Sequence, residues 1–335
     1  MLGKKKNNKK YFVAILVVMV IVIFSVQFVN ASDYTIKIGG VWGPDAILTK
    51  GHYLFKDIIE RTSEGKIEVK IYPSEQLGSQ TEITDSVKMG AIEMAWCDVN
   101  KVNNKFQIIG MPFLFESLEK ARSALNSTVI KRFREEAEQN GYHIVGMIVQ
   151  PPRNITNNVK PIEKPDDLKG LLLRVPPRDL YRKSMEYLGA SPQSISLGET
   201  YMALKTGVVD GQENPSMNII DMKFYEVQKY LSLVKYTIYP GTYCLNADFY
   251  ESLPDKYKKL VDSAAQTTVD YIMWYYETES EEYEQFLREK MIVNEITPEN
   301  HKLFVEKLTP LWQEYINAGL FSKEELDQIR AYTEG

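Results

Sequence analysis

Arg174 is the residue of this 335-residue chain whose setting most favours ligand binding. It follows three leucines and precedes Val175 and two prolines, which places its guanidinium at the end of an apolar strand predicted over 171–175. Ligands of open α/β sheets bind beyond the carboxyl ends of the strands. A planar guanidinium held there suits a carboxylate, because it donates two parallel hydrogen bonds. A structural salt bridge to one of the 45 acidic residues is the alternative role that position alone leaves open.

Arg153 and Asn214 are further polar candidates. Arg153 comes directly after two prolines that end an apolar strand predicted over 142–149, so it too lies just past a strand end. A solvated hinge residue is the alternative for Arg153. Asn214 precedes Pro215, and local chemistry alone predicts a helix N-cap there, because an Asn side chain accepts hydrogen bonds from the free amides of a helix start.

Three more residues could contribute to a pocket. Asp98 follows a buried strand predicted over 92–96, and its carboxylate could accept hydrogen bonds from sugar hydroxyls or cap the next turn. Trp42 and Tyr236 are aromatic candidates for pocket walls. For either aromatic residue alone, packing in the core is the more frequent role.

Known catalytic and metal motifs are absent from the sequence. It has no G-x-S-x-G, G-x-x-x-x-G-K-[ST], H-E-x-x-H or G-x-G-x-x-G, which removes the enzyme classes that those motifs mark. The three histidines are far apart and there is no C-x-x-C pair, so we expect neither a zinc site nor another cofactor. Cys97 and Cys244 are the two cysteines, and an exported protein could pair them or keep them as buried thiols.

The charge distribution excludes a nucleic-acid partner. Hydrophobic residues make up 44% of the chain and charged residues 25%, an ordinary globular composition. The first 31 residues contain five lysines and no acid, and the rest carries 35 basic and 45 acidic residues. A body with a net charge of −10 lacks the clustered cations that phosphate contacts need.

The N-terminus is typical of a secretory signal. Five lysines precede the almost wholly apolar segment 11–29, and small residues at Val29-Asn30-Ala31 provide a cleavage site. We therefore expect a signal peptide over residues 1–31, cleavage after Ala31 and a periplasmic location. Because the apolar run has 19 residues and ~20 span a bilayer, an uncleaved membrane anchor is the alternative.

Strand and helix patterns alternate along the rest of the chain. Short apolar strands are predicted at 34–38, 66–72, 92–96 and 142–149, with amphipathic helices between them. This alternation predicts an α/β protein with mainly parallel sheets and covering helices. From Ser252 to about Lys290, apolar residues recur every three to four positions and predict one helix of roughly 50 Å. A helix of this length could lie across two intertwined lobes.

Six segments carry a resemblance to a known family. They run in family order over nearly the whole mature chain: KIEVKIYPSEQLGSQTEI (66–83), MPFLF (111–115), DLKGLLLRVPP (167–177), LGASPQSI (188–195), ALKTGVVDGQENP (203–215) and EVQKYLSL (226–233). The chain resembles the solute-binding proteins of tripartite ATP-independent periplasmic (TRAP) transporters, of the four-carbon-dicarboxylate-binding type. GVVDGQENP after a strand ending in RVP is the most specific part of the match.

The resemblance implies a two-lobed periplasmic-binding-protein-like fold that closes on its solute, with a long helix spanning both lobes. Lobe 1 would comprise 32–155 and be completed by roughly 241–270. Lobe 2 would comprise 156–240 and be completed by roughly 271–335.

The resemblance also implies roles for single residues. The family's signature arginine, which binds a carboxylate, matches Arg174, and a second frequent ligand arginine matches Arg153. The family's asparagine matches Asn214, and Asp98 falls where members vary and select the solute. The chain departs from the family after EVQKYL, where many members carry a histidine and this chain has Lys235 and Tyr236.

These observations predict a binding protein rather than an enzyme. We expect an extracytoplasmic receptor for a small organic acid, either a dicarboxylate or a sugar acid such as a uronate. It would deliver that solute to the integral-membrane subunits of a TRAP permease, and Arg174 and Arg153 would lie near each other in one cleft. A secreted enzyme acting on an acidic sugar is the alternative from another class. An anchored ligand sensor is a third reading if the segment 11–29 is not cleaved.

Overall fold

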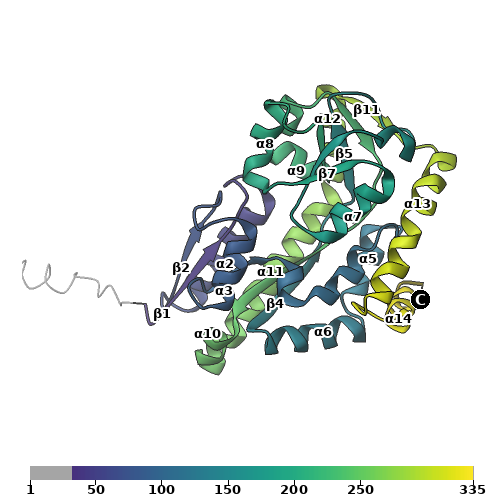
Figure 1. Ribbon diagram of the computed structural model, residues 1–335. Coiled ribbons are helices and arrows are strands. Elements are labelled where there is room, and N and C mark those ends of the chain that lie inside the picture. The colour runs from purple at the N-terminus through teal and green to yellow at the C-terminus, as the bar shows by residue number, and fades with distance from the viewer. Residues whose placement is uncertain (1–31, 335) are drawn as a thin grey trace, which may run out of the picture.

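The computed structural model describes residues 32–334. The predicted signal peptide, its cleavage after Ala31 and the alternative membrane anchor lie outside these residues. Two β-sheets with covering helices form two lobes, drawn one above the other in Figure 1. None of the helices in the described part of the chain is long and apolar enough to cross a membrane.

The first lobe is built on a five-stranded sheet in the order β2-β1-β3-β10-β4. Its strands are β1 (Tyr34–Gly39), β2 (Ile67–Tyr72), β3 (Met94–Cys97), β4 (Tyr142–Val149) and β10 (Pro240–Asn246). β1 is parallel to β2 and β3, whereas β10 lies between β3 and β4 and is antiparallel to both. β3 is buried along its whole length.

The second lobe is built on a six-stranded sheet in the order β11-β9-β5-β8-β6-β7. Its strands are β5 (Arg153–Asn157), β6 (Leu172–Val175), β7 (Ser191–Ser194), β8 (Gly211–Pro215), β9 (Tyr230–Leu233) and β11 (Ile292–Glu295). β6 is parallel to β7 and β8, and β9 is parallel to β11, but β5 is antiparallel to β8 and β9.

The expectation of mainly parallel sheets is met only in part: five of the nine strand pairings are parallel, and β5 and β10 make both sheets mixed. These two strands are the ones that the chain enters directly from the other lobe, through the extended segments 150–152 and 234–239. No helix reverses the chain at either crossing, so each strand keeps the direction in which it arrives. The two crossing segments are hydrogen-bonded to each other, from the Gln150 amide to the Tyr239 carbonyl (2.8 Å) and from the Arg153 amide to the Thr237 carbonyl (3.0 Å). The predicted lobe boundaries at 155 and 240 stay predictions.

Helices cover both sheets. In the first lobe they are α2 (Ile47–Thr62), α3 (Gln80–Lys88), α4 (Val99–Asn103), α5 (Leu118–Ala124), α6 (Thr128–Gln139) and α10 (Ala247–Ser252). In the second lobe they are α7 (Asp179–Leu188), α8 (Leu197–Lys205) and α9 (Ser216–Asp221). One large buried apolar cluster extends from the first lobe into the second, and a smaller one lies among α8, α9 and β9.

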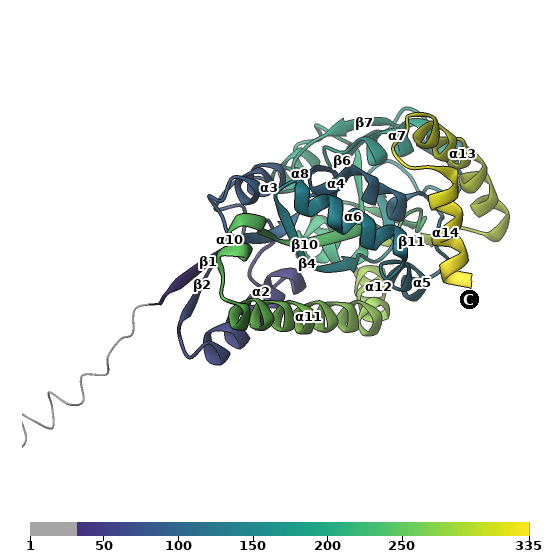
Figure 2. The ribbon, with the colours of Figure 1, turned by 90° about the horizontal axis from the view of Figure 1, so that it is seen from below.

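Four further helices join the lobes: α11 (Asp255–Thr278), α12 (Ser280–Lys290), α13 (Pro298–Asn317) and α14 (Lys323–Glu334). The single helix expected over 252–290 is interrupted at Glu279, so it is two helices. α11 packs on α2 and β4 of the first lobe, and α12 packs on α9 of the second. Figure 2 shows α11 running along the first lobe toward α12.

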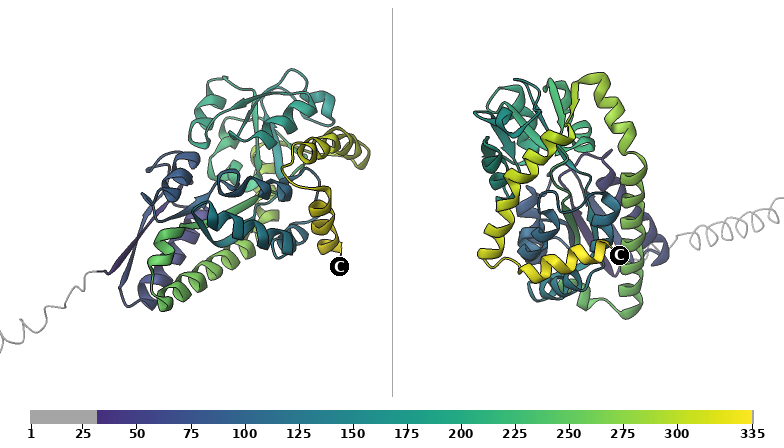
Figure 3. Two further views of the ribbon diagram at one scale, coloured as in Figure 1. Left: turned by 60° about the horizontal axis from the view of Figure 1, so that its bottom comes forward. Right: turned by 90° about the vertical axis from the view of Figure 1, so that its right-hand side faces the viewer.

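A second helical connection lies on the opposite side of the molecule, as the right-hand view of Figure 3 shows. There α13 packs on α7 of the second lobe, and α14 packs on α5 and α6 of the first. The long helical span across both lobes is thus present as the pair α11 and α12. How 241–335 is divided between the lobes stays a prediction.

Candidate ligand-binding site

A cavity of about 140 Å³ lies between the two lobes. Trp42, Trp96 and Asp98 line it from the first lobe, and Arg174, Arg178 and Asn214 line it from the second. Arg153, at the crossing between the lobes, lines it as well. Because both lobes contribute, a molecule in this cavity would contact both and favour their closed arrangement.

Arg174 enters the cavity wall from β6, in register with Gln212 of β8 and Gln193 of β7. The side chain is 1% exposed, its Nε donates a hydrogen bond to the Ile195 carbonyl (2.8 Å), and its Nη1 has no partner. Burial lowers the pKa of Arg174 to about 9, Glu213 raises it in part, and Arg153 lowers it further. No carboxylate of residues 32–334 lies within ion-pair distance of the guanidinium, so an anion in the cavity would be its natural partner.

Arg153 has such a partner already. As the first residue of β5 it lies beside β8, where its Nε donates to the Glu213 carboxylate and its Nη2 donates to Glu213 Oε1 (2.9 Å). Both side chains are buried, and the guanidinium lies 4.4 Å from the centre of the Tyr181 ring. Burial lowers the pKa of Arg153, but the charge and hydrogen bonds of Glu213 together with the nearby Tyr181 and Tyr236 outweigh burial, so the pKa is raised. Arg153 is therefore neutralised before any ligand binds.

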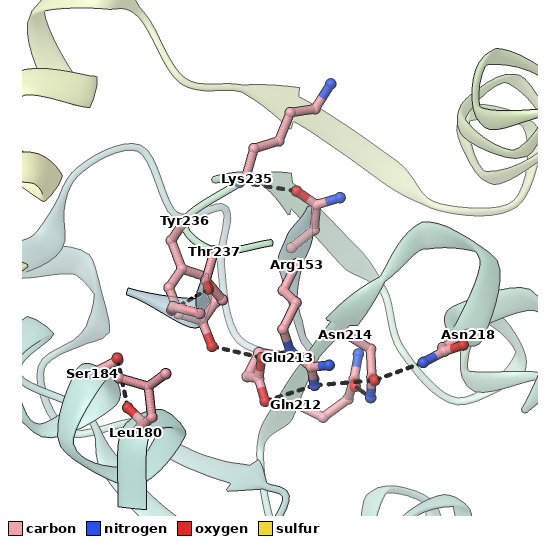
Figure 4. Close-up of polar contacts among 12 residues, drawn as sticks. Arg153, Leu180, Ser184, Gln212, Glu213, Asn214, Asn218, Lys235, Tyr236 and Thr237 are labelled. Carbon is pink, nitrogen blue, oxygen red and sulfur yellow. Dashed lines mark hydrogen bonds and ion pairs between the residues drawn. The ribbon is translucent and has the colours of Figure 1, made fainter. Parts of the chain in front are cut away.

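Asn214 and Tyr236 complete the hydrogen-bond network around this pair (Figure 4). Asn214 Oδ1 accepts from Arg153 (3.1 Å) and from Asn218 (3.2 Å), and Asn214 Nδ2 donates to Gln212 (2.6 Å). Asn214 lines the cavity but does not cap α9, whose N-cap position is Pro215. The fully buried Tyr236 does not line the cavity, and its hydroxyl donates to Glu213 (2.7 Å).

Asp98 joins the two lobes across the cavity. Its Oδ1 caps α4 by accepting from the Asn100 amide (3.0 Å), and its Oδ2 accepts from Arg178 Nε of the second lobe (2.9 Å). The Asp98 side chain is 6% exposed and that of Arg178 18% exposed. Burial lowers the pKa of Arg178, but the charge and hydrogen bond of Asp98 together with the nearby Tyr239 and Tyr181 outweigh burial, so the pKa is raised. The Asp98 carboxylate thus both caps α4 and forms an ion pair between the lobes.

Trp42 and Trp96 form part of the first-lobe wall of the cavity. Both indoles are buried, and neither Nε1 has a hydrogen-bond partner. Trp96 stacks on Tyr243 of β10 at 4.4 Å between ring centres, which fixes its plane. An indole N–H donates only, so these two groups would serve an acceptor such as a hydroxyl or carboxylate oxygen.

Sequence reasoning missed Glu213 and Arg178. Glu213 lies inside the segment GVVDGQENP, and Arg178 follows the two prolines of LLLRVPP, so each stood next to a residue that was singled out. A signal existed for Arg178, because a third arginine close to Arg174 needs its own partner. Glu213 had none, since only the pairing of β5 with β8 brings it to Arg153.

Cys97 and Cys244 are free thiols in the structure, and both are buried. They lie on the neighbouring strands β3 and β10, where Cys97 is opposite Thr242 and Cys244 is opposite Ala95. Burial and the neighbouring Cys244 raise the pKa of the Cys97 thiol. Within residues 32–334 no cluster of three or more His, Cys, Asp or Glu side chains could hold a metal ion.

Two lobes joined by extended crossings, with a buried arginine in the cavity between them that pairs with no carboxylate of residues 32–334, are the features expected of a solute-binding protein. The chain belongs to the bacterial extracellular solute-binding protein family 7, whose model matches residues 38–318. The resemblance to TRAP solute-binding proteins is thereby confirmed. The family members similar to this chain are binding proteins rather than enzymes, as the sequence predicted.

Relatives of known name extend over most of the chain. The C4-dicarboxylate-binding periplasmic protein DctP of Rhodobacter capsulatus is 28% identical over 90% of this chain and 92% of its own length. The sialic acid-binding periplasmic protein SiaP of Vibrio cholerae is 26% identical over 88% of this chain and 92% of its own length.

Solved structures confirm the two-lobed fold. A TRAP periplasmic solute-binding protein from Haemophilus influenzae with bound L-gulonate superimposes with a TM-score of 0.85 at 26% identity, covering 89% of this chain and 99% of that one. The sugar acid binding protein DctPAm of Advenella mimigardefordensis, in complex with galactonate, gives a TM-score of 0.86 at 25% identity, covering 91% of this chain and 99% of that one.

Proposed function

We propose that this chain is a periplasmic receptor that binds a small organic acid between its lobes and delivers it to a TRAP-type membrane permease. The observation that carries the proposal is the buried Arg174 guanidinium, which lies in a cavity lined by both lobes and pairs with no carboxylate of the described residues 32–334. A carboxylate is the anion whose two oxygens match that planar fork.

The predicted site residues have different roles in this proposal: one binds the carboxylate, and the others line the cavity or position a neighbour. Arg174 binds the carboxylate directly. Arg153 lines the cavity and is held by Glu213, Asn214 lines the cavity and accepts a hydrogen bond from Arg153, and Tyr236 positions Glu213 from behind. Asp98 and Trp42 face the part of the solute that lies against the first lobe.

The names of the relatives support the ligand class. Similar proteins bind C4-dicarboxylates or sialic acid by name, and solved neighbours hold L-gulonate, galactonate or succinate. All of these ligands carry a carboxylate. The periplasmic names of the relatives and the lysine-led apolar segment at the N-terminus support export after cleavage at Ala31.

Thermal-shift screening of the purified chain against carboxylates tests the proposal. Binding stabilises the folded state by RT ln(1 + [L]/Kd), or ~4 kcal/mol at a thousandfold excess over Kd. We expect at least one of succinate, galactonate, glucuronate and sialic acid to raise the melting temperature, to bind in calorimetry and to be recovered unchanged. If none binds, or if the bound acid is consumed, the receptor function is wrong.

Delivery needs a second assay. Proteoliposomes that contain the TRAP permease of the same organism should take up the bound acid only when the receptor is added outside. Uptake that is independent of the receptor would refute delivery without affecting solute binding.

A further inference from the structure

The charges of the cavity point to the number of carboxylates in the solute. The lining lies wholly within residues 32–334, and its charged side chains are Asp98, Arg153, Arg174 and Arg178. Glu213 lies directly behind them and pairs with Arg153, while Asp98 pairs with Arg178 at 2.9 Å. Two of the three arginines are thus neutralised by the protein. One positive charge, that of Arg174, remains for a ligand.

One carboxylate besides Asp98 and Glu213 lies close enough to Arg174 to interact with its charge. Glu75 of the first lobe interacts electrostatically with Arg174, but its Oε1 accepts a hydrogen bond from the Gly198 amide at the start of α8 (3.2 Å). It lines a separate surface hollow and not the cavity between the lobes. Glu75 therefore does not form an ion pair with Arg174. The positive charge of Arg174 remains available to one carboxylate of a ligand.

The rest of the polar lining is uncharged. Within residues 32–334 the side chains of Gln150 and Thr81 and the Oδ1 atom of Asn218 make no hydrogen bond, and the indole nitrogens of Trp42 and Trp96 make none either. Amides and hydroxyls both donate and accept, whereas indoles donate. Such groups match solute hydroxyls, which also donate and accept.

We propose that the cavity selects a monocarboxylate that carries several hydroxyl groups, that is, a sugar acid, over a dicarboxylate, and that Asp98 is the residue that sets this preference. The inference rests on the proposed receptor function and narrows its ligand. Asp98 pairs with Nε of Arg178 and so neutralises the positive charge that a second carboxylate would need. A second carboxylate therefore meets the Asp98 charge or a wall without a free cation, and an unpaired buried charge is strongly disfavoured.

Pairs of acids that differ in one group test the selection in the wild-type chain. Galactonate and galactarate share the same hydroxylated chain, and galactarate has a second carboxylate in place of the terminal CH₂OH. Erythronate and succinate have four carbons each, and butyrate lacks both hydroxyls and second carboxylate. In calorimetry we expect galactonate to bind at least a hundredfold more tightly than galactarate, and erythronate at least tenfold more tightly than succinate or butyrate.

The substitution Asp98→Asn tests the assigned residue. Asn keeps the cap of α4, because Asn and Asp are equally good N-caps, but it releases Arg178 as a second free cation. The ratio of galactonate to galactarate affinity should fall at least tenfold in this variant. Asp57→Asn removes the same charge from the exposed face of α2, where Asp57 pairs with Arg61, and should leave the ratio unchanged.

The outcomes separate this inference from the receptor function. If succinate or galactarate binds more tightly than the matched monocarboxylate, the selection is wrong while the receptor stands. If Asp98→Asn binds both acids with the wild-type ratio, the role of Asp98 is wrong. If no carboxylate binds at all, the receptor function itself fails. The comparison within the wild-type chain remains decisive even if Asp98→Asn does not fold.

Discussion

Replacing Arg174 by methionine distinguishes a ligand-binding arginine from a structural one, because the two roles predict opposite effects on the unliganded protein. Methionine keeps an unbranched apolar stem of similar reach and removes the buried charge. If Arg174 waits for a carboxylate, the unliganded variant should be more stable than the wild type, and its affinity for the acid should be lost.

The size of the gain follows from the environment of the guanidinium. Burial lowers the pKa of Arg174 to about 9, and a fall of this size corresponds to about 5 kcal/mol at ~1.4 kcal/mol per pKa unit. The hydrogen bond from Nε to the Ile195 carbonyl, worth about 1 kcal/mol, is lost, and so is some packing. We therefore expect a net gain of about 1–3 kcal/mol in the free energy of unfolding, or roughly 2–8 °C in melting temperature.

The expected loss of affinity is large in the same variant. Truncating one partner of a buried charge pair costs ~2–5 kcal/mol, which is about thirtyfold to several thousandfold in Kd at ~1.4 kcal/mol per decade. Arg174→Lys keeps the charge without the planar fork, and the loss of one charge-assisted hydrogen bond at ~1.5–3 kcal/mol predicts a Kd about ten- to hundredfold weaker.

Urea unfolding without ligand and calorimetry with galactonate measure the two effects. Arg182→Met is the matched control, because Arg182 lies on the outer face of α7 with 37% of its side chain exposed. It should change neither stability nor affinity appreciably. An unliganded Arg174→Met protein that unfolds at clearly lower urea than the wild type would refute the reasoning, since Arg174 would then be holding the fold together.

Three further predictions concern titration, a buried ion pair and a close backbone approach. A bound carboxylate favours the charged form of Arg174 and raises its pKa above the unliganded value of about 9. Kd should therefore be constant from pH 6 to 8 and increase up to tenfold per pH unit above about pH 9. A Kd that calorimetry finds unchanged up to pH 10.5 would contradict this. Glu213→Gln leaves Arg153 buried without its partner, and denaturant titration should record a loss of ~3–5 kcal/mol; a loss under 1 kcal/mol would show that the pair is dispensable. A Cβ on Gly211 would lie 2.0 Å from a β5 carbonyl oxygen, whereas one on Gly43 meets nothing within 4 Å. Gly211→Ala should therefore lower the free energy of unfolding by about 3 kcal/mol or more, and Gly43→Ala should leave it almost unchanged. Equal melting temperatures of the two variants would show that the strands shift apart freely.

The sequence predicted those features that depend on short stretches of chain. Arg174 stands in a run of apolar residues that ends in two prolines, so both its strand and its place at the strand end follow from neighbours within five positions. The ion pairs that decide its role do not. Glu213 reaches Arg153 across 60 residues through antiparallel pairing, and Arg178 reaches Asp98 across 80 residues and two lobes. A single sequence gives no register for such pairs.

The break between α11 and α12 was also beyond local reasoning. Glu279 has neither the ring of proline nor the flexibility of glycine, and apolar periodicity continues on both sides of it. The helix ends there because α11 follows the first lobe and α12 follows α9 of the second. Tertiary packing, which the periodicity does not encode, decides where one helix becomes two.

The place of β10 between β3 and β4 has a consequence for how the chain is made. The ribosome completes β3 at Cys97 and β4 at Val149, which is 149 and 97 residues before β10 is complete at Asn246. Until then β3 has one unpaired edge and β4 has no partner strand in this sheet, and such edges invite pairing with other chains. The five-stranded sheet of the first lobe can therefore be completed only after most of the second lobe has been synthesised. A nascent chain that ends before residue 246 should need a holding chaperone, however much of the first lobe it contains.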